Sequence, residues 1–341
     1  IAPQISAGPG ALIQAADGAV ILAAGQKLEI RGRGLDGIVF EVQAPEDQAV
    51  NLGNIERNAA GIFAGSLRHS GQIDVQATQS DGGKVILQAS DSTTVDGAIR
   101  AQRLHNIGGL IQATAAQVKL TGNANLDASG AAAGGQINVG GGWQGKDEGI
   151  RNAQATQGEA GARLNADATQ KGDGGTVTVW SHGLTRYEGQ ISARGGPQGG
   201  NGGNAEVSGK LSLLYQGAAD LRAPQGQMGT LLLDPAAMTI SGGGGTAPDT
   251  IYESQIESAT ANVLVSATGS VNAAGVFSGG ASGSELTLPS NINLRVETTG
   301  AGSGVNLTGV PLTIRAQGTG RVELSTTALG ATIQVPSIQT D

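Results

Sequence analysis

The chain has 341 residues, 58 of them glycine, with a formal net charge of -8, no cysteine and only 2% aromatic residues. The lack of cysteine excludes disulfide scaffolds and thiolate metal sites, and the scattered lysines and arginines argue against nucleic acid, because phosphate binding needs clustered positive charge. So few aromatic side chains predict a narrow core of Ala, Val, Ile and Leu that runs along the molecule, unlike the core of a globular enzyme.

Neither a membrane span nor a targeting segment is evident. No stretch approaches the roughly 18 to 20 apolar residues of a membrane-spanning helix. Residues 1–30 lack the basic start and the continuous apolar core of a signal peptide. We therefore expect the chain to be soluble as given, with any export signal outside it.

Glycine pairs followed by short alternating apolar runs recur along the chain. The pairs are Gly82-Gly83, Gly108-Gly109, Gly134-Gly135, Gly174-Gly175 and Gly202-Gly203, and the single Gly229 continues the series. Successive anchors are 26 to 28 residues apart, except that one step, between the third and fourth pairs, is longer by about half a repeat. A period of this length is typical of a solenoid coil.

Within each repeat the sequence predicts three short strands joined by small and polar turn residues. The segments VILQASDSTTVDGAIRAQ and VTVWSHGLTRYEGQISARG share this order. In each, a glycine (Gly97 or Gly189) stands just before an apolar residue (Ile99 or Ile191) that is expected to point inward. The sequence therefore predicts an all-β solenoid of triangular section with about 26 to 28 residues per coil, in which corner glycines supply the positive φ of sharp turns.

Two stretches of the solenoid are expected. Residues 1–240 are predicted to form regular coils, with a charged and polar loop leaving the coil near residues 143–162. The glycine-rich segment Ser241–Asp249 indicates a wide turn. Beyond it, residues 241–341 are expected to continue the β-helix less regularly.

One short helix is a candidate at Ile251–Ser258, with a strand as the alternative for so short a segment. Thr250 is a candidate cap, and Ile251 and Ile256 would face inward. Elsewhere we expect minimal helix.

Two segments in succession resemble a known protein family. They are GGTVTVWSHGLTRYEGQISARGGPQGGNGGNAEVSGK (Gly174–Lys210) and GTLLLDPAAMTISG (Gly229–Gly242). Both resemble large exoproteins of the filamentous haemagglutinin type, the secreted partners of bacterial two-partner secretion. Further similar segments occur upstream and downstream in the order that the family has, so the resemblance covers most of the chain.

The resemblance implies a right-handed parallel β-helix that is secreted or displayed on the bacterial cell surface. It also implies Sec-dependent export, passage through an outer-membrane β-barrel transporter partner, and a role in adhesion, aggregation or biofilm formation. The amino-terminal secretion domain of such proteins is not evident in this sequence. We therefore expect an internal rod segment, with the transporter engaged through a region outside it.

The sequence contains only weak signals for a cofactor or metal site. GRGLDG at Gly32–Gly37 has the letters of a dinucleotide fingerprint, but IVFEVQAP follows it where a helix is required. His69, His105 and His182 occur at different phases of the repeat without a ligand partner at suitable spacing, so we interpret them as solvent-facing turn residues. We expect no cofactor and no metal.

Recurrent aspartates near turns allow an enzyme hypothesis. They are Asp74, Asp96, Asp127, Asp167 and Asp220. Stacked coils would bring such residues into a row, and glycoside-cleaving sites use carboxylate pairs. Uncompensated carboxylates about 5 Å apart repel each other, however, and turn aspartates serve to cap backbone amides. We predict no catalytic residue, and we interpret Asp234, which precedes a proline, as a turn residue too.

The rare aromatic residues are the candidate contacts for a glycan or another partner. They are Trp143, Trp180, Tyr187 and Tyr215. Trp180 ends an alternating strand, and with Tyr187 on the next strand it would offer a stacking surface for sugars. Core or edge packing is the alternative for these rings.

Three functions follow from this reading. The first is a structural adhesin rod that binds a polysaccharide or a host-cell receptor through weak multivalent contacts. The second is a polysaccharide-degrading enzyme on the same fold. The third is an inert spacer that carries a distal functional domain.

Overall fold

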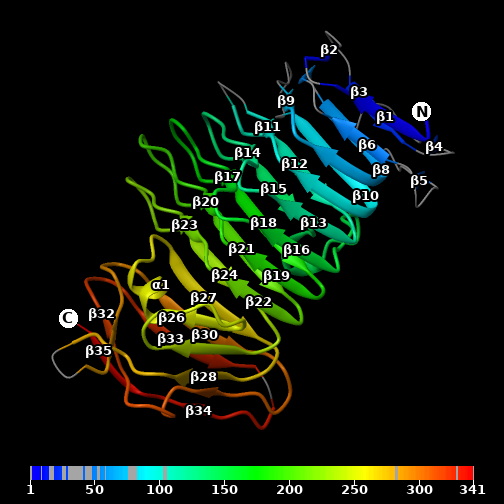
Figure 1. Ribbon diagram of the computed structural model, residues 1–341. Helices are drawn as coiled ribbons and strands as arrows, with labels where there is room; N and C mark the ends of the chain where they lie inside the picture. Colours follow the sequence, from blue (N-terminus) through cyan, green and yellow to red (C-terminus); the bar gives the residue numbers. More distant parts are fainter. Residues whose placement is uncertain are drawn as a thin grey trace.

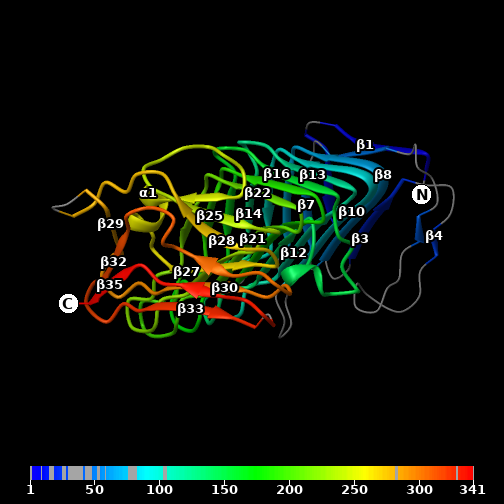
Figure 2. The same ribbon diagram turned by 90° about the horizontal axis from the view of Figure 1, so that it is seen from below.

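The computed structural model describes residues 2–8, 10–14, 19–24, 28–29, 41–42, 48–51, 54–57, 59–75, 83–102, 106–280, 283–327 and 329–340. The chain winds into a parallel β-solenoid of about 10 turns, with roughly 28 residues per turn and 3% helix. The coils stack along one axis, and the two ends of the chain lie at opposite ends of the molecule (Figures 1 and 2). The predicted all-β, parallel β-helix is confirmed.

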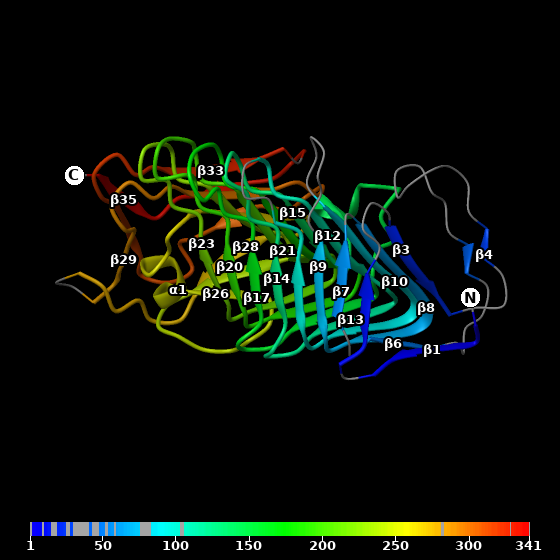
Figure 3. The same cartoon turned by 90° about the horizontal axis from the view of Figure 1, so that it is seen from above.

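The strands fall on three faces (Figure 3). The first face is continuous and contains, in stacking order, β3 (Ala19–Ala23), β8 (Ala59–His69), β10 (Lys84–Val95), β12 (Leu110–Thr114), β15 (Gln136–Val139), β18 (Thr176–Ser181), β21 (Asn204–Gly209), β24 (Thr230–Leu233), β27 (Asn262–Ala267), β30 (Leu294–Thr298) and β33 (Val322–Thr326).

The long strands β8 and β10 bend around a corner and so belong to the second face as well. The other strands of that face are β1 (Gln4–Ala7), β6 (Gln48–Asn51), β13 (Gln117–Leu120), β16 (Ala155–Gly158), β19 (Leu184–Tyr187) and β22 (Ser212–Tyr215), followed by β26 (Thr250–Tyr252), β25 (Met238–Ser241), β28 (Val271–Ala274), β31 (Val305–Asn306) and β34 (Ile333–Gln334).

The third face consists of very short strands. They are β2 (Leu12–Gln14), β7 (Asn54–Arg57), β9 (Gln72–Val75), β11 (Ala98–Arg100), β14 (Asn125–Asp127), β17 (Arg163–Asn165), β20 (Gln190–Ser192) and β23 (Ala218–Asp220), and later β29 (Glu285–Thr287), β32 (Thr313–Ala316) and β35 (Ser337–Thr340). The pair β4 (Leu28–Glu29) and β5 (Glu41–Val42) is antiparallel.

Inward-facing apolar side chains form ladders through the coils. On the first face, Val85, Ile111 and Ile137 are register partners, and all three are fully buried. On the third face, Ile99 and Ile191 point inward as predicted. Most of the buried apolar residues form one continuous cluster. Each coil covers the apolar side chains of its neighbours. The narrow core is therefore buried by the stacking of coils and does not need the width of a globular core.

The second glycine of each anchor pair lies where the backbones of two coils approach closely. A Cβ atom on Gly135 would stand 2.1 Å from the carbonyl oxygen of Gly109, and a Cβ atom on Gly175 would stand 2.0 Å from that of Gly135. The positive-φ glycines of the described residues do not include these positions. Positive φ occurs as predicted at turn glycines such as Gly140, Gly161 and Gly172, whereas the anchor glycines leave room for the neighbouring backbone.

The longer repeat contains a loop that leaves the coil. Ile137 on β15 stacks on Val177 of β18, forty positions later. The additional residues, 140–154, connect β15 to β16 and include a short 3-10 turn, η1 (Trp143–Gly145). Part of the segment expected to be loop, Ala155–Gly158, forms β16 and pairs with β13.

The glycine-rich segment after β25 reverses the local stacking order. Thr239 to Ser241 of β25 pair with Thr250 to Tyr252 of β26, which comes later in the chain but lies toward β22. Asp249 joins the two layers: its backbone N–H donates to Leu213 O (2.6 Å), and its Oδ1 accepts from Leu213 N (2.7 Å). The first face meanwhile continues directly from β24 to β27.

The predicted short helix is present with shifted bounds. Helix α1 spans Glu253–Glu257, its N-cap is Tyr252, and the expected cap Thr250 begins β26 instead. Ile251 and Ile256 are buried, as predicted. Within the described part of the chain, no helix has the length and apolar character needed to cross a membrane.

Candidate functional site

The outward-facing side chains of the third face form two regular columns. In each coil they flank the buried middle residue of a short strand, as in Arg163-Leu164-Asn165. Neighbouring coils place equivalent side chains about 4.8 Å apart. One column contains Asn125, Arg163, Gln190 and Ala218, and the other contains Asp127, Asn165, Ser192 and Asp220.

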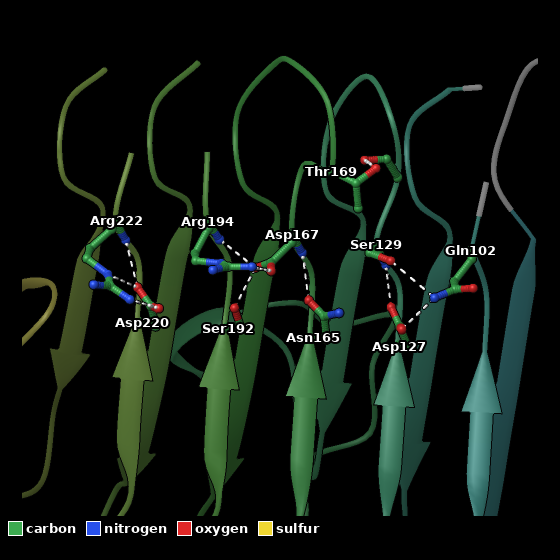
Figure 4. Close-up of polar contacts among 11 residues, drawn as sticks. Gln102, Asp127, Ser129, Asn165, Asp167, Thr169, Ser192, Arg194, Asp220 and Arg222 are labelled. Carbon is green, nitrogen blue, oxygen red and sulfur yellow. Dashed lines mark hydrogen bonds and ion pairs between the residues drawn. The ribbon is translucent and has the colours of Figure 1, made fainter. Parts of the chain in front are cut away.

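Two arginines just beyond the third-face strands are held by aspartates (Figure 4). The Arg194 backbone N–H donates to Asp167 Oδ1 (2.7 Å), and its guanidinium Nε donates to Asp167 Oδ2 (3.0 Å). One coil further on, Arg222 Nε and Nη2 donate to the two carboxylate oxygens of Asp220 at 2.8 and 2.7 Å. Both arginine side chains remain more than half exposed, at 52% and 57%. The two guanidinium groups are therefore oriented but accessible.

The charge state of Asp220 follows from this contact. Burial raises the pKa of its carboxyl, but the hydrogen bonds and positive charge of Arg222 outweigh that effect, so the pKa lies below its ordinary value. Asp220 is therefore ionised at neutral pH and is not suited to be a general acid.

Two adjoining hollows, together called the groove, lie over these residues. One part, of about 620 Å³, lies among the turns after β17, β20 and β23, where Pro197, Pro224 and Met228 provide apolar walls. The other part, of about 460 Å³, crosses β14, β17, β20 and β23 and is lined by the polar columns. Asp167 and Arg194 line both parts. Apolar walls with a few fixed polar groups are typical of ligand sites.

The groove differs in charge from the rest of the chain. Arg163, Arg194 and Arg222 line it together with two aspartates, Asp167 and Asp220, which gives one positive charge in excess, whereas the whole chain carries -8. Arg163 is exposed and forms no ion pair with any other described residue. The groove therefore offers one uncompensated guanidinium, on β17, one coil before Arg194 and two coils before Arg222, which are both already held.

Asp167 is expected to hold the turn that forms one wall of the groove. We expect Asp167→Asn to lower the free energy of unfolding by about 1 to 3 kcal/mol, because the amide cannot replace the charged acceptor of the Arg194 and Ser192 hydrogen bonds. Urea unfolding measures this change. Asp147→Asn is the matched control, since Asp147 is exposed and caps only Gly149; an equal loss in both variants would contradict the assignment.

The recurrent aspartates do not form a row of carboxylates. Asp74, Asp127 and Asp220 share one column, but Arg100 lies between the first two, and Asn165 and Ser192 lie between the last two. No two of these three aspartates are therefore register partners in adjacent coils. Asp127 Oδ1 accepts from Ser129 N (2.9 Å), which is the capping role expected of a turn aspartate.

Asp96 and Asp167 lie outside that column. Asp96 follows β10 at the corner before β11, and hydrogen bonds from Thr121 and Asn123 lower the pKa of its carboxyl. Asp167 lies two residues beyond the strand position of Asn165.

Three of the four candidate aromatic contacts are buried. Tyr187 and Tyr215 belong to the core cluster, and the Tyr187 hydroxyl donates to Gln190 O (3.1 Å). Trp180 faces away from the core but is only 4% exposed, because the loop of residues 140–154 covers its ring. Trp143, in η1, is partly buried. The rings of Trp180, Tyr187 and Tyr215 thus present no stacking face to solvent.

The histidines differ from one another. His69 was expected to face solvent, and that expectation is wrong: it is fully buried, its Nε2 donates to Ala98 O (3.1 Å), and desolvation lowers its pKa to about 4. His182 is partly buried with its ring edge-on to Trp180 at 4.8 Å. His105 and the GRGLDG segment lie outside the described residues. Among those described, no cluster of three or more His, Cys, Asp or Glu is arranged to hold a metal ion.

A second polar cluster lies beneath the loop of residues 140–154. Glu206 is fully buried on the outward side of the first face, and its Oε2 accepts a hydrogen bond from Gln144 N–H at 2.6 Å. Its Oε1 and the hydroxyl of its register neighbour Thr178 have no hydrogen-bond partner. Burial raises the pKa of Glu206 to about 7.

Sequence reasoning missed both the groove and Glu206. The groove has a sequence signal: in β14, β17 and β20 a polar residue precedes and follows the inward apolar residue of the third strand, as in Gln190-Ile191-Ser192. For Glu206 no such signal exists, because its outward position in the alternating segment NAEVSG indicates an exposed side chain.

No protein-family model matches the chain, and no curated protein matches it either. Among solved structures, the chain is similar to the secretion domain of HMW1 from Haemophilus influenzae, with a TM-score of 0.54 and 26% sequence identity over 66% of this chain. The match spans 63% of the secretion domain's own chain, which is less than two thirds of it. No secretion domain is evident from the sequence, whereas this similar structure is one.

Proposed function

We propose that this chain is the structural rod of a secreted or surface-displayed bacterial adhesin, which mediates attachment to cells or matrix, aggregation or biofilm formation. The observation that carries the proposal is the similarity of the β-solenoid to the secretion domain of HMW1. The continuous first face, from β3 to β33, supports a stiff extended element. In this proposal residues 1–240 and 241–341 are successive stretches of one rod.

The proposed export route is two-partner secretion. The resemblance of Gly174–Lys210 and Gly229–Gly242 to filamentous haemagglutinin-type exoproteins supports it independently of the fold. The partner is then an outer-membrane β-barrel transporter, and the final location is extracellular or on the bacterial surface. As an internal rod segment, the chain would engage the transporter through a region outside it.

A second candidate function is favoured by one observation. The similar solved structure is itself a secretion domain, so the chain would direct export on its own. The test is to place it behind a cleavable export signal and co-express it with the transporter of its source organism. Release into the medium that depends on the transporter supports this candidate, and retention in the periplasm supports the internal rod.

The enzyme alternative remains a separate hypothesis. The groove contains two carboxylates, as a glycan-cleaving site requires. Each of them is engaged by an arginine, however, and the contact with Arg222 keeps the pKa of Asp220 low. An assay for new reducing ends on polysaccharides distinguishes the enzyme hypothesis from the adhesin hypothesis. Formation of new reducing ends favours the enzyme, and binding without their formation favours the adhesin.

The attachment function is tested with the chain coupled to fluorescent beads. We expect coated beads to adhere to bacterial or epithelial cells, or to matrix-coated surfaces, several-fold more than beads coated with an inert protein of the same size. Counting adherent beads under flow measures this. If coated beads adhere to none of these surfaces, the chain is a spacer and the adhesin proposal falls.

A further inference from the structure

The groove on the third face has the shape of a site for a polymer. Its two parts share Asp167 and Arg194 and together reach from Asn125 on β14 to Thr260 beyond β23. It crosses β14, β17, β20 and β23. These strands follow one another in the direction in which the coils stack (Figure 3). An extended chain laid along the rod would meet the same kind of surface coil after coil.

The polar groups in the groove repeat at the coil spacing. Asn165 and Ser192, from successive coils, point outward from register-paired positions, and so do Arg163 and Gln190. The interval is about 4.8 Å, the distance between neighbouring strands. Such a series of amide, hydroxyl and guanidinium groups matches a ligand whose hydroxyl groups also repeat along a chain.

The charge of the groove selects an acidic ligand. Arg194 and Arg222 are oriented by their own aspartates, whereas Arg163 has no ion pair among the described residues and is exposed beside them. A guanidinium group binds a carboxylate through two parallel hydrogen bonds, which fixes geometry as well as charge. The apolar walls formed by Pro197, Pro224 and Met228 suit the carbon face of a sugar ring.

Two other acidic polymers fit less well. Nucleic acid needs a run of basic residues, and the groove has an excess of only one positive charge. An extended peptide would need a free strand edge to pair with. The strands that floor the groove between β14 and β23 are paired on both sides: β17 pairs with β14 and β20, and β20 pairs with β17 and β23.

We propose that this groove binds a polysaccharide that carries carboxylate groups, with Arg163 as the residue that pairs with a carboxylate and the polar columns contacting the hydroxyls. The inference deepens the attachment function and rests on it. A groove without aromatic stacking binds weakly at one site, so attachment through it relies on many copies at a surface.

The test is titration calorimetry with polygalacturonate fragments of defined length. We expect binding to the intact chain that weakens as salt concentration rises. The same fragments with their carboxyl groups methyl-esterified should not bind measurably. Arg163→Gln should weaken binding about tenfold or more, the loss expected for one charged hydrogen-bonded pair.

A second variant and a matched control complete the experiment. Ala218→Glu adds a carboxylate to an exposed position in the groove floor and should also weaken binding about tenfold. Lys210→Gln removes an exposed cation between β21 and β22, away from the groove, and should bind like the intact chain. Far-UV circular dichroism shows that each variant is folded.

Several results would overturn the assignment. They are equal weakening by Lys210→Gln, equal binding of the esterified fragments, equal binding of poly-glutamate or DNA, and no binding of polygalacturonate by the intact chain. If the last occurs while coated beads still adhere, the groove proposal fails and the attachment function stands. If the fragments bind but beads adhere to nothing, the groove proposal stands and the attachment function fails.

Discussion

Gly175→Ala is expected to lower the free energy of unfolding by about 3 kcal/mol or more. The added methyl group would stand 2.0 Å from the carbonyl oxygen of Gly135 and 2.8 Å from its nitrogen, both of them backbone atoms. That carbonyl already accepts a hydrogen bond from Thr176 N (2.9 Å). Two coils would have to separate locally, which weakens the ladder between β15 and β18 in the middle of the rod.

Urea unfolding followed by far-UV circular dichroism measures this loss. Gly8→Ala is the matched control, because no atom lies within 4 Å of the position its methyl group would take. We expect it to change stability by less than about 1 kcal/mol. A Gly175→Ala variant as stable as the control would show that the coils are not packed as closely as described.

The glycine anchors show how far sequence reasoning reaches in a repeat protein. Their period was predictable because each coil places the same residue at the same corner, so the sequence repeats the structure directly. Their physical role was not predictable, because it depends on the close approach of Gly175 to Gly135, which lie forty positions apart in the sequence. Local conformational rules address φ within one turn and contain no information about the backbone of the next coil.

The aromatic residues illustrate a different limit. Alternation correctly indicates that Trp180 faces away from the core, since it lies outside the core cluster. Its burial depends on residues 140–154, which have no periodic pattern and fold over the strand through Gly141 and Gly145. A loop without a repeating sequence pattern can be located from the extra length of its repeat, but the surface against which it packs is set by tertiary contacts.

Glu206 lies under the same loop, and its titration is expected to make stability depend on pH. Its ordinary pKa of 4.5 is raised to about 7 by burial, and Gln144 N–H is the donor to its Oε2. The other charged groups that act on it are Asp234, whose own pKa burial also raises, and Lys146. Neither removes the cost of ionising a carboxylate in this position.

The sign follows from comparing the folded and unfolded chains. Between pH 4.5 and about 7 the unfolded chain releases this proton and the folded chain keeps it, so stability falls as the pH rises through this window. The full difference corresponds to about 3 kcal/mol. His69 acts in the opposite sense, because desolvation lowers its pKa from 6.5 to about 4. The stability that its neutral form contributes is therefore lost as the pH falls from 6.5 to about 4.

Glu206→Gln isolates the contribution of the carboxylate, because His69 is unchanged and cancels in the comparison with the intact chain. The amide cannot ionise, and its oxygen can still accept from Gln144 N–H. We expect the free energy of unfolding of the variant, relative to that of the intact chain, to rise by about 2 to 3 kcal/mol between pH 5 and pH 8, as measured by urea unfolding at both pH values.

Glu148→Gln, which neutralises an exposed carboxylate of the same loop, should show no such gain. If the advantage of Glu206→Gln is the same at both pH values, the carboxylate ionises freely in the folded chain and the loop does not bury it. The expected gain would instead mean that residues 140–154 form a fixed cover over the first face, held at a cost in stability that grows as the pH rises from 4.5 to about 7.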